Sequence, residues 1–549
     1  MPREGNLSHW NRPIGLSRRT LLKGSAGLLV GTAAFGMFAG RAFAADQVLK
    51  IAHPVFTMDW SPMLGGGHAF RWNSLWWASP MYFNSKGEIQ PYLFTSWEPS
   101  NDAKTWTFKL KDGAKFSDGS PITAAEVKGS WEAAAMPATK NQRVPQVLSG
   151  VDGYDAIANG GANSLPGVTT PDDTTVVVNL VASDPIFYMR IANHIVPIIQ
   201  ASKARDADGN LNIEWYTPQN GGVSSGPFKM ASVDFDGGKA SFEPNPNFFG
   251  TAPKLARVEL QTVEDNVAAT ALLQSGEFNA HTELVTPTVI QDLGPEFSAG
   301  PIIPTGQHFW FNLSKKPFDD PKVREALVLA VDRDGLIKAS FPDGPHMKAD
   351  QIIYPVPGSE DSGFAPYAYD PEKAKALLAE SSYGGPDNLP KLLFAGISSP
   401  ARSVAAQYIA EQWRKNLGIQ AFDMKPSQEE FGAEGNNVQI VRDDVGTRVP
   451  DAVSYLAGSI ASTSSNAINK LGGYKNADID TLLADAALLA ADDPQRIAKA
   501  QQAQQLFHND FAFIPWYHEA MSRWALPTVK GMDKNLDWQV AEPWAIEIA

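Results

Sequence analysis

The segment Gly222–Gly226 has the glycine and serine spacing of a hydrolase nucleophile. It reads Gly-Val-Ser-Ser-Gly, and the G-x-S-x-G turn of serine hydrolases lies between a strand and a helix, so that the serine oxygen faces the substrate. Here the following Pro-Phe-Lys-Met has the character of a strand instead of a helix. A structural turn is therefore the favoured interpretation, and catalysis by Ser224 is the alternative.

Histidine is the other residue type that could support chemistry in this chain. There are nine histidines and no cysteine, so disulfides and thiolate metal sites are excluded. No pair of histidines has the i, i+4 spacing of H-E-x-x-H. His53, His68 and His308 could approach one another in a cleft and hold a metal complex, but core or hydrogen-bonding histidines are favoured because no spacing motif supports a metal. We therefore expect no resident metal or other cofactor.

Three pairs of adjacent aspartates could suggest carboxylate catalysis, and two of these pairs precede a proline. Asp319-Asp320 and Asp492-Asp493 stand directly before Pro321 and Pro494, where a helix cap or a solvated turn is the usual role of an acidic residue. The third pair, Asp443-Asp444, has no such context. Because no complete catalytic constellation is present, the elements that position these residues are the better guide to function.

The stretch Trp97–Trp131 has the clearest local layout. Residues 106–110 alternate between apolar and polar side chains, which predicts a strand with one buried face. Two Asp-Gly turn dipeptides follow. Thr123 is then placed to cap a helix, with Glu126 three residues on as in a capping box. This is a scaffold pattern and holds no catalytic group.

Strand and helix patterns recur along the rest of the chain. A helix with Asp370 as its cap is expected after Tyr369. Further strands are expected at 47–52, 174–180, 308–312 and 514–517, and further helices at 268–276, 323–331 and 478–488.

Size and charge restrict the class of protein. The whole chain carries a net charge of −14, and its first 44 residues hold six Lys/Arg and one acidic residue, so the remaining 505 residues carry −19. That length is enough for two or three domains with full cores. An acidic surface of this size excludes nucleic acid and anionic membranes as partners, because both require a basic patch.

Residues 1–44 read as a targeting segment, separate from the fold. Ser17-Arg18-Arg19-Thr20-Leu21-Leu22-Lys23 is typical of a twin-arginine export signal, residues 24–40 are apolar and rich in Gly and Ala, and Ala42-Phe43-Ala44 is an A-x-A cleavage site. A membrane anchor is the alternative, although the run is short and weakly apolar for a span. No cysteine is present for a lipid anchor. We therefore expect a periplasmic protein without a membrane span after processing, exported by the twin-arginine route.

A long, ungapped motif identifies a family resemblance. Residues 106–127 read W-T-F-K-L-K-D-G-A-K-F-S-D-G-S-P-I-T-A-A-E-V and closely resemble the signature of the family 5 solute-binding proteins, the dipeptide-, oligopeptide- and nickel-binding components of ABC importers. Similar blocks run from about Asp59 to Tyr517, among them Asp332-Arg333. The resemblance implies a protein that captures a small-molecule ligand and delivers it to an ABC permease and ATPase complex, with no reaction catalysed.

The same resemblance implies an α/β, two-lobed periplasmic binding protein fold (type II-like) with an extra insert domain. Lobe I is expected to comprise residues 45–82, 198–303 and 520–549, the insert domain residues 83–197, and lobe II residues 304–519. The ligand is expected in the cleft between the lobes of a monomer, which close like a hinge. Two other classes remain open: a secreted serine hydrolase that uses Ser224, and a periplasmic sensor or chaperone with a binding-protein fold.

Residues 439–451 resemble the ligand-contacting segment of peptide binders, G-W-x-A-D-Y-x-D-P, in which the Trp packs on the ligand and an Asp pairs with the α-ammonium group of the peptide. Alignment through Ser454-Tyr455-Leu456 places Arg448 at that Asp. A guanidinium in place of the acid suits a carboxylate or a phosphate. We therefore expect a ligand with an anionic or hydroxyl-rich end, different from an ordinary peptide. The alternative is that Arg448 pairs internally with Asp443 or Asp444.

Aromatic residues near the implied cleft point to the same kind of ligand. Trp310 and Asn312 share one face of a strand by alternation. Flat aromatic rings suit sugar rings, opine-like conjugates of sugars and amino acids, or cationic groups, and packing between domains is the alternative. The candidate ligand-binding residues are aromatic, charged and polar side chains implied to line the cleft, namely His68, Arg71, Trp72, Trp310, Asn312, Arg442, Asp444, Thr447, Arg448 and Tyr517.

Overall fold

The computed structural model of the protein describes residues 47–53, 73–282 and 302–549, apart from gaps at 85–86, 142, 206–210, 213–214, 343, 345, 355, 357–358, 360–364, 426–437, 448, 521–522 and 533–541. All described residues belong to one compact unit, Ala44–Ala549. The expected targeting segment and the candidates His68, Arg71, Trp72 and Arg448 lie outside the described residues. Within the described part of the chain, no helix is long and apolar enough to cross a membrane.

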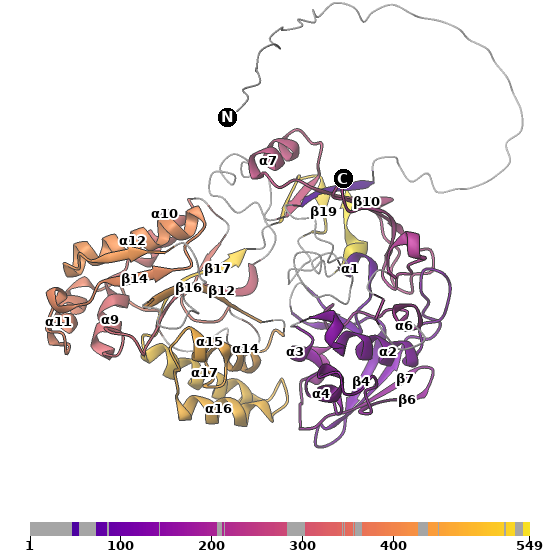
Figure 1. Ribbon diagram of the computed structural model, residues 1–549, viewed down its shortest axis with the longest axis horizontal. Coiled ribbons are helices and arrows are strands. Elements are labelled where there is room, and N and C mark those ends of the chain that lie inside the picture. The colour runs from indigo at the N-terminus through magenta and orange to yellow at the C-terminus, as the bar shows by residue number, and fades with distance from the viewer. Residues whose placement is uncertain are drawn as a thin grey trace, which may run out of the picture. The chain divides into compact units, whose positions relative to one another are not determined.

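The first six-stranded sheet combines strands from both ends of the chain (Figure 1). Its order is β18 (Arg523–Ala525), β11 (Ala280–Thr282), β1 (Val48–His53), β10 (Arg257–Thr262), β9 (Lys239–Pro244) and β8 (Phe228–Asp234). β1 runs parallel to β10 and β11, and the other pairs are antiparallel. Leu49 and Ile51 are buried while Lys50 is exposed, because successive side chains of a strand point to opposite faces.

A four-stranded antiparallel sheet contains the predicted scaffold stretch. Its order is β4 (Phe94–Pro99), β5 (Thr105–Leu110), β7 (Thr175–Asn179) and β6 (Val168–Asp172). The predicted strand is β5, in which Trp106, Phe108 and Leu110 are buried. The helix that follows is α2 (Ala124–Ala135), which packs on β6 and β7.

The capping box predicted for this helix is wrong. The side chain of Thr123 makes no capping hydrogen bond. Glu126 Oε2 instead accepts a hydrogen bond at 2.7 Å from the backbone N–H of Ala201, at the start of the short helix α6 (Ala201–Ala204). A contact from a distant part of the chain has therefore taken the carboxylate that the local pattern assigned to the cap.

The second six-stranded sheet is formed by the C-terminal half of the chain. Its order is β13 (Met347–Lys348), β17 (Phe513–Ala520), β12 (Ile302–Phe311), β16 (Ile440–Gly446), β14 (Leu392–Ala395) and β15 (Phe422–Met424). β12 is antiparallel to both β16 and β17, whereas β14 runs parallel to β15 and β16. β12 therefore lies in the interior of the sheet, between two long partners.

Helices cover both faces of this second sheet (Figure 1). α10 (Arg333–Ser340) and α12 (Pro400–Leu417) lie on one side, and α14 (Ala452–Ile460), α16 (Ala477–Ala487) and α17 (Pro494–Asn509) lie on the other. Asp320 and Asp370 cap α9 (Pro321–Leu329) and α11 (Pro371–Glu380), and Asp493 caps α17. The structure thus confirms that these aspartates act at turns and caps.

Shorter elements complete the described part of the chain. They are α1 (Asn73–Trp76), β2 (Met81–Phe83), β3 (Ile89–Pro91), α3 (Pro145–Leu148), α4 (Tyr154–Ala158), α5 (Phe187–Arg190), α7 (Asn266–Gln274), α15 (Ser465–Asn469), β19 (Val529–Lys530) and β20 (Glu547–Ile548).

Two large hydrophobic cores divide the structure into two lobes. One core joins the first six-stranded sheet to the four-stranded sheet and contains Ile51, Trp76 and Phe108. The other packs the second six-stranded sheet against its helices and contains Phe309 and Trp413. We call the first six-stranded sheet with its helices lobe I, the four-stranded sheet with its helices the insert domain, and the second six-stranded sheet with its helices lobe II. The α/β, two-lobed architecture is confirmed, while the residue limits expected for each domain stay a prediction.

The Gly222–Gly226 segment is a turn at the junction of lobe I and the insert domain. Ser225 Oγ accepts a hydrogen bond from Ala78 N (2.8 Å) and donates one to the carbonyl oxygen of Ile198 (2.6 Å). Ser224 is buried, and its backbone N–H donates to Ser117 Oγ at 3.0 Å. The strand β8 follows in place of the helix that a nucleophile turn requires, so the motif has a structural role.

Gly226→Ala is expected to destabilise the protein. A Cβ at this position would lie 2.6 Å from the carbonyl carbon of Trp76 and 2.7 Å from the nitrogen of Trp77, and neither backbone atom can rotate away. We expect the free energy of unfolding to fall by about 1–3 kcal/mol. Gly150→Ala is the matched control, because no atom lies within 4 Å of an added Cβ there. Equal denaturant midpoints for the two variants would contradict this assignment.

Candidate ligand-binding site

A row of polar side chains crosses the middle strands of lobe II. Gln307 on β12 pairs with Asp444 on β16 and with Tyr517 on β17. Directly paired residues of neighbouring strands point to the same face of a sheet. Arg442 and Glu519 lie two residues along from Asp444 and Tyr517, so alternation places them on that face as well. The candidates Arg442, Asp444 and Tyr517 are thereby brought together.

Charges of both signs meet on this face. Glu519 Oε2 accepts a hydrogen bond from Gln307 Nε2 at 2.9 Å. Arg402, in the first turn of α12, lies near Arg442: burial and then this like charge lower the pKa of the Arg402 guanidinium, while three nearby oxygen-bearing side chains oppose that shift. We refer to these six residues as the polar cluster: Gln307, Arg402, Arg442, Asp444, Tyr517 and Glu519.

The polar cluster is deep but reaches solvent at Asp444. Arg442 is only 2% exposed and Tyr517 only 7%, whereas Asp444 is exposed. Desolvation by the surrounding protein nevertheless raises the pKa of Asp444, and the Asp443 carboxylate raises it further, against the opposing effect of Lys470 and Arg442. Asp444 therefore binds a proton at a higher pH than an isolated, fully hydrated aspartate.

Tyr517 contributes a neutral hydroxyl to the polar cluster. Burial, and then the negative charge of Glu519, raise the pKa of its phenol above the ordinary value, so the group stays protonated and can both donate and accept hydrogen bonds. Its ring is fixed by edge-on contacts with Phe341 and Trp516. The cluster therefore offers cationic, anionic and neutral hydrogen-bonding groups on a rigid sheet.

Side chains on the opposite face of the sheet bond to the β16 strand at Asp443 and Asp444. Trp310 Nε1 donates to the carbonyl oxygen of Asp443 at 3.2 Å. Lys470 Nζ pairs with Asp443 Oδ2 at 2.7 Å and donates to the carbonyl oxygen of Asp444 at 2.9 Å. Two side chains thus fix the backbone of the aspartate pair from behind, and this fixes the direction in which Asp444 points.

Three other candidates have hydrogen bonds or packing inside lobe II. Trp310 is fully buried in the core of the lobe. Asn312 Oδ1 accepts hydrogen bonds from Ser314 N (3.1 Å) and Ser314 Oγ (2.7 Å), and Thr447 Oγ1 donates to the carbonyl oxygen of Val449 at 2.7 Å. A ligand contact for these residues stays a prediction, as it does for His68, Arg71, Trp72 and Arg448, which lie outside the described residues.

Half of the polar cluster was not anticipated from the sequence. Arg402 is separated from Arg442 by 40 positions and occupies an ordinary first-turn position of a helix. Gln307 and Glu519 belong to strands whose register is known only from the structure. The one available signal was alternation, which places Glu519 on the same strand face as Tyr517.

The histidines give no support to a metal complex. His308 is fully buried in lobe II with Nε2 2.8 Å from the carbonyl oxygen of Ile352, and His53 ends strand β1 in lobe I. Across the part of the chain that the structure describes, no group of three or more His, Asp or Glu side chains could hold a metal ion. His68, the third histidine considered, lies outside that part.

Comparison with known proteins identifies related chains. Residues 88–467 match the family model described as bacterial extracellular solute-binding proteins, family 5 middle. The chain is 26% identical over 467 residues to the periplasmic oligopeptide-binding protein OppA of Salmonella typhimurium, covering 81% of this chain and 82% of the relative. It is 27% identical over 465 residues to heme-binding protein A of Haemophilus influenzae, covering 81% of each.

The fold also matches solved structures. The structure of NikA from Brucella suis in complex with Fe(III)-EDTA superposes with a TM-score of 0.75 at 20% sequence identity, covering 91% of this chain and 100% of the other. At that level of identity the match shows a shared fold.

Proposed function

Because the chain belongs to family 5 of the bacterial extracellular solute-binding proteins, we propose that it is the periplasmic binding component of an ABC importer, which captures a small solute between its lobes as a monomer and delivers it to a permease. A member of this family is a solute-binding protein and not an enzyme, so the hydrolase interpretation of Ser224 is abandoned. The relatives are named for oligopeptides and heme, and the structural neighbour holds Fe(III)-EDTA. Membership therefore leaves the class of ligand open.

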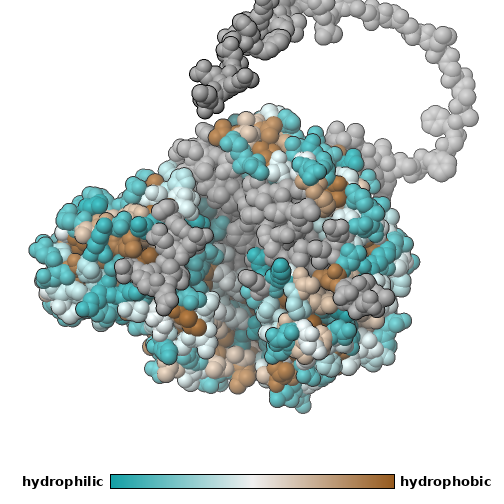
Figure 2. Space-filling model, viewed as in Figure 1, coloured by the Kyte–Doolittle hydropathy of each residue, from teal (hydrophilic) through white to brown (hydrophobic). Residues whose placement is uncertain are grey.

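The convergence of Arg402 and Arg442 is the observation that supports a ligand with an anionic group. Each guanidinium can bind a carboxylate or a phosphate through two parallel hydrogen bonds. Residues 45–549 carry a net charge of −19. Two neighbouring arginines therefore stand out against the acidic character of the rest of the protein. Hydrophilic residues are interspersed with hydrophobic ones over the visible surface (Figure 2).

The acidic side of the polar cluster defines the rest of the ligand. Glu519 can accept hydrogen bonds from the hydroxyl or ammonium groups that a peptide-like, opine-like or oligosaccharide ligand would carry, and Asp444 can accept them from hydroxyl groups whether or not it is protonated. Thr447 and Arg448 follow Asp444 on the same segment of the chain. In this proposal Arg448 binds the anionic end of the ligand. The alternative is an internal ion pair between Arg448 and Asp443 or Asp444. At Asp443, Arg448 would have to compete with Lys470, which already pairs with that carboxylate.

A ligand screen by thermal shift tests this proposal. Peptides, opines, oligosaccharides and metal chelates would be compared, and a ligand at 100 times its dissociation constant should stabilise the protein by about 2.7 kcal/mol. We expect the compounds that bind the unmodified protein to be anionic. Their dissociation constants should rise at least tenfold in Arg402→Gln. Arg414→Gln is the control on the same helix. Arg414 does not belong to the polar cluster, and its Nη1 lies 3.2 Å from Glu411 Oε2. Ordinary dipeptides or tripeptides that bind equally well to Arg402→Gln would contradict the assignment.

Binding of an anionic ligand is expected to strengthen in mild acid. The pKa of Asp444 lies above its ordinary value of 3.8 because of desolvation and then Asp443, so Asp444 takes up a proton at a higher pH than a usual aspartate. Its negative charge then no longer competes with the ligand for Arg402 and Arg442. Calorimetric titration should give a dissociation constant that falls as the pH is lowered from neutral toward the raised pKa of Asp444. In Asp444→Asn it should be low and independent of pH, and an unchanged pH profile in this variant would refute the role of Asp444.

Export by the twin-arginine route is part of the same proposal. The relative OppA is described as periplasmic, and Arg18-Arg19 precedes an apolar run. We expect Arg18→Lys/Arg19→Lys to retain the precursor in the cytoplasm, measured by cell fractionation and immunoblotting. Arg12→Lys, six residues upstream of Arg18, is the control and should be exported normally. Full export of the double variant would refute the twin-arginine route while leaving the binding function intact.

A further inference from the structure

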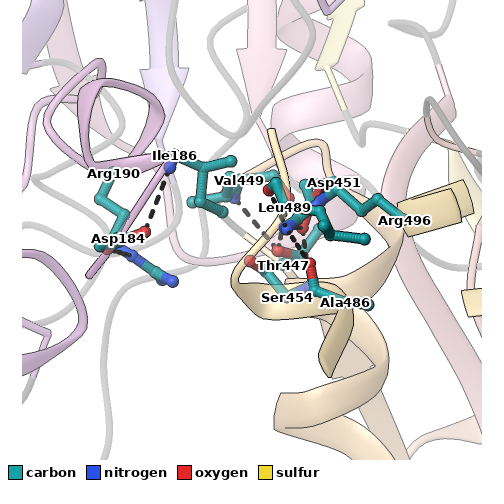
Figure 3. Close-up of polar contacts among 10 residues, drawn as sticks. All are labelled: Asp184, Ile186, Arg190, Thr447, Val449, Asp451, Ser454, Ala486, Leu489 and Arg496. Atoms are coloured by element: carbon teal, nitrogen blue, oxygen red, sulfur yellow. Dashed lines mark hydrogen bonds and ion pairs between the residues drawn. The ribbon is translucent and has the colours of Figure 1, made fainter. Parts of the chain in front are cut away.

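A third apolar cluster joins the insert domain to lobe II. Ile186, Met189 and Val449 form it, and they belong to neither of the two large cores. Ile186 is 1% exposed and Val449 is 7% exposed, although the two residues are more than 260 positions apart. Figure 3 shows Ile186 beside Val449. Each side chain is therefore buried because the other domain covers it.

The lobe II side of this cluster is held rigidly. Thr447 Oγ1 bonds both the carbonyl oxygen and the N–H of Val449, at 2.7 Å and 3.1 Å. Two residues on, Asp451 accepts hydrogen bonds from Arg496 Nε and Nη2 at 2.9 Å and 2.7 Å. Arg496 is 2% exposed and Asp451 5%, and a buried ion pair with two parallel hydrogen bonds fixes the backbone on which it stands.

The insert-domain side is also prepared for contact. Asp184 Oδ1 accepts from the backbone N–H of Ile186 at 3.2 Å, and Asp184 Oδ2 pairs with Arg190 Nε at 2.6 Å. The N–H of Met189 donates to the carbonyl oxygen of Ile186 at 2.8 Å. The polar contacts drawn in Figure 3 stay within each side. The surfaces that meet are mainly apolar, and Tyr188 of the insert domain also packs there, close enough to Asp492 of lobe II for that charge to help raise its pKa after burial.

Two rigid surfaces that meet through apolar side chains can separate and meet again. Separation breaks none of the hydrogen bonds that shape either side, and it exposes only a small apolar area to water. The contact consists of three buried side chains with four partly buried ones packed against them. It is much smaller than either large core, so it can shift a two-state equilibrium without locking it. A large core, by contrast, could not open on the timescale of ligand exchange.

We propose that Ile186, Met189 and Val449 form a latch between the insert domain and lobe II, and that this latch sets the ratio of closed to open protein. Val449 follows Asp444 by five positions on the same rigid segment, so a closing motion of the lobes around a ligand at the polar cluster also brings Val449 against Ile186. The three residues act as positioning residues that change affinity without touching the ligand. This goes beyond the proposed transport function and does not depend on which solute is bound.

The absence of cysteine in the chain makes the latch directly measurable. Spin labels at Ala156→Cys and Lys475→Cys, both exposed positions in the insert domain and lobe II, would report the separation of the two parts in the full ligand-free chain. We expect a major short distance and a minor long distance in the labelled parent. Adding Ile186→Ala and Val449→Ala should reduce the ratio of short to long distances at least tenfold.

The control removes the same chemical groups from the surface. Val181 and Ile468 are 64% and 53% exposed, and they lie in the insert domain and lobe II. Val181→Ala with Ile468→Ala should leave the distance distribution as in the parent. A distribution that is unchanged in the Ile186→Ala/Val449→Ala variant, with its circular dichroism intact, would overturn the latch.

A second variant keeps the inference testable if the double alanine variant does not fold. Ile186→Cys with Val449→Cys, in the otherwise cysteine-free chain, should be joined by a short bis-maleimide cross-linker in the ligand-free state. With the cross-link in place, spin labels at the same two reporter positions, introduced on unnatural side chains, should show the short distance alone. Failure of the folded protein to cross-link would show that the two surfaces do not meet in solution, and would also overturn the proposal.

Discussion

The antiparallel pairing of β12 with β17 is the constraint on which the rest of the structure depends. These strands carry the chain into lobe II and out of it, and Ile302 pairs with Ala520 where they begin and end. The two crossings are therefore neighbours in one ladder, as expected for a hinge. Gln307 and Tyr517 pair further along the same ladder. The polar cluster is thus built on the rigid continuation of the segment about which the lobes would move.

Electrostatics separate the structural charges of lobe II from those of the polar cluster. Asp451 with Arg496, and Asp443 with Lys470, are ion pairs at 2.7 Å, as burial requires of charged groups. In the polar cluster, burial and a second guanidinium lower the pKa of Arg402, and desolvation raises the pKa of Asp444. Shifts in these directions mean that the folded protein disfavours the charged forms, a property shared by functional sites and by structural networks of charges.

Sequence patterns succeeded where a residue's role depends on its near neighbours. Alternation gave β5 with its buried Trp106, and the Asp-Pro pairs gave the caps at Asp320 and Asp493. The same reasoning failed at Thr123, because Glu126 bonds to Ala201, which is 75 positions away. Alternation also placed Trp310 on one strand face, but it could not show that this face is covered by the lobe II core.

The sequence by itself determined the family, the local strands and turns, and the helix caps at Asp320, Asp370 and Asp493, because each of these depends on residues within a few positions of one another. Only the tertiary structure decided which charges meet. Arg402 comes from a helix, while Asp444 and Glu519 come from two strands that flank β12. It also decided that Ile186 is buried against Val449 and in neither large core. Such contacts follow from the packing of whole sheets and helices, which patterns of neighbouring residues do not encode.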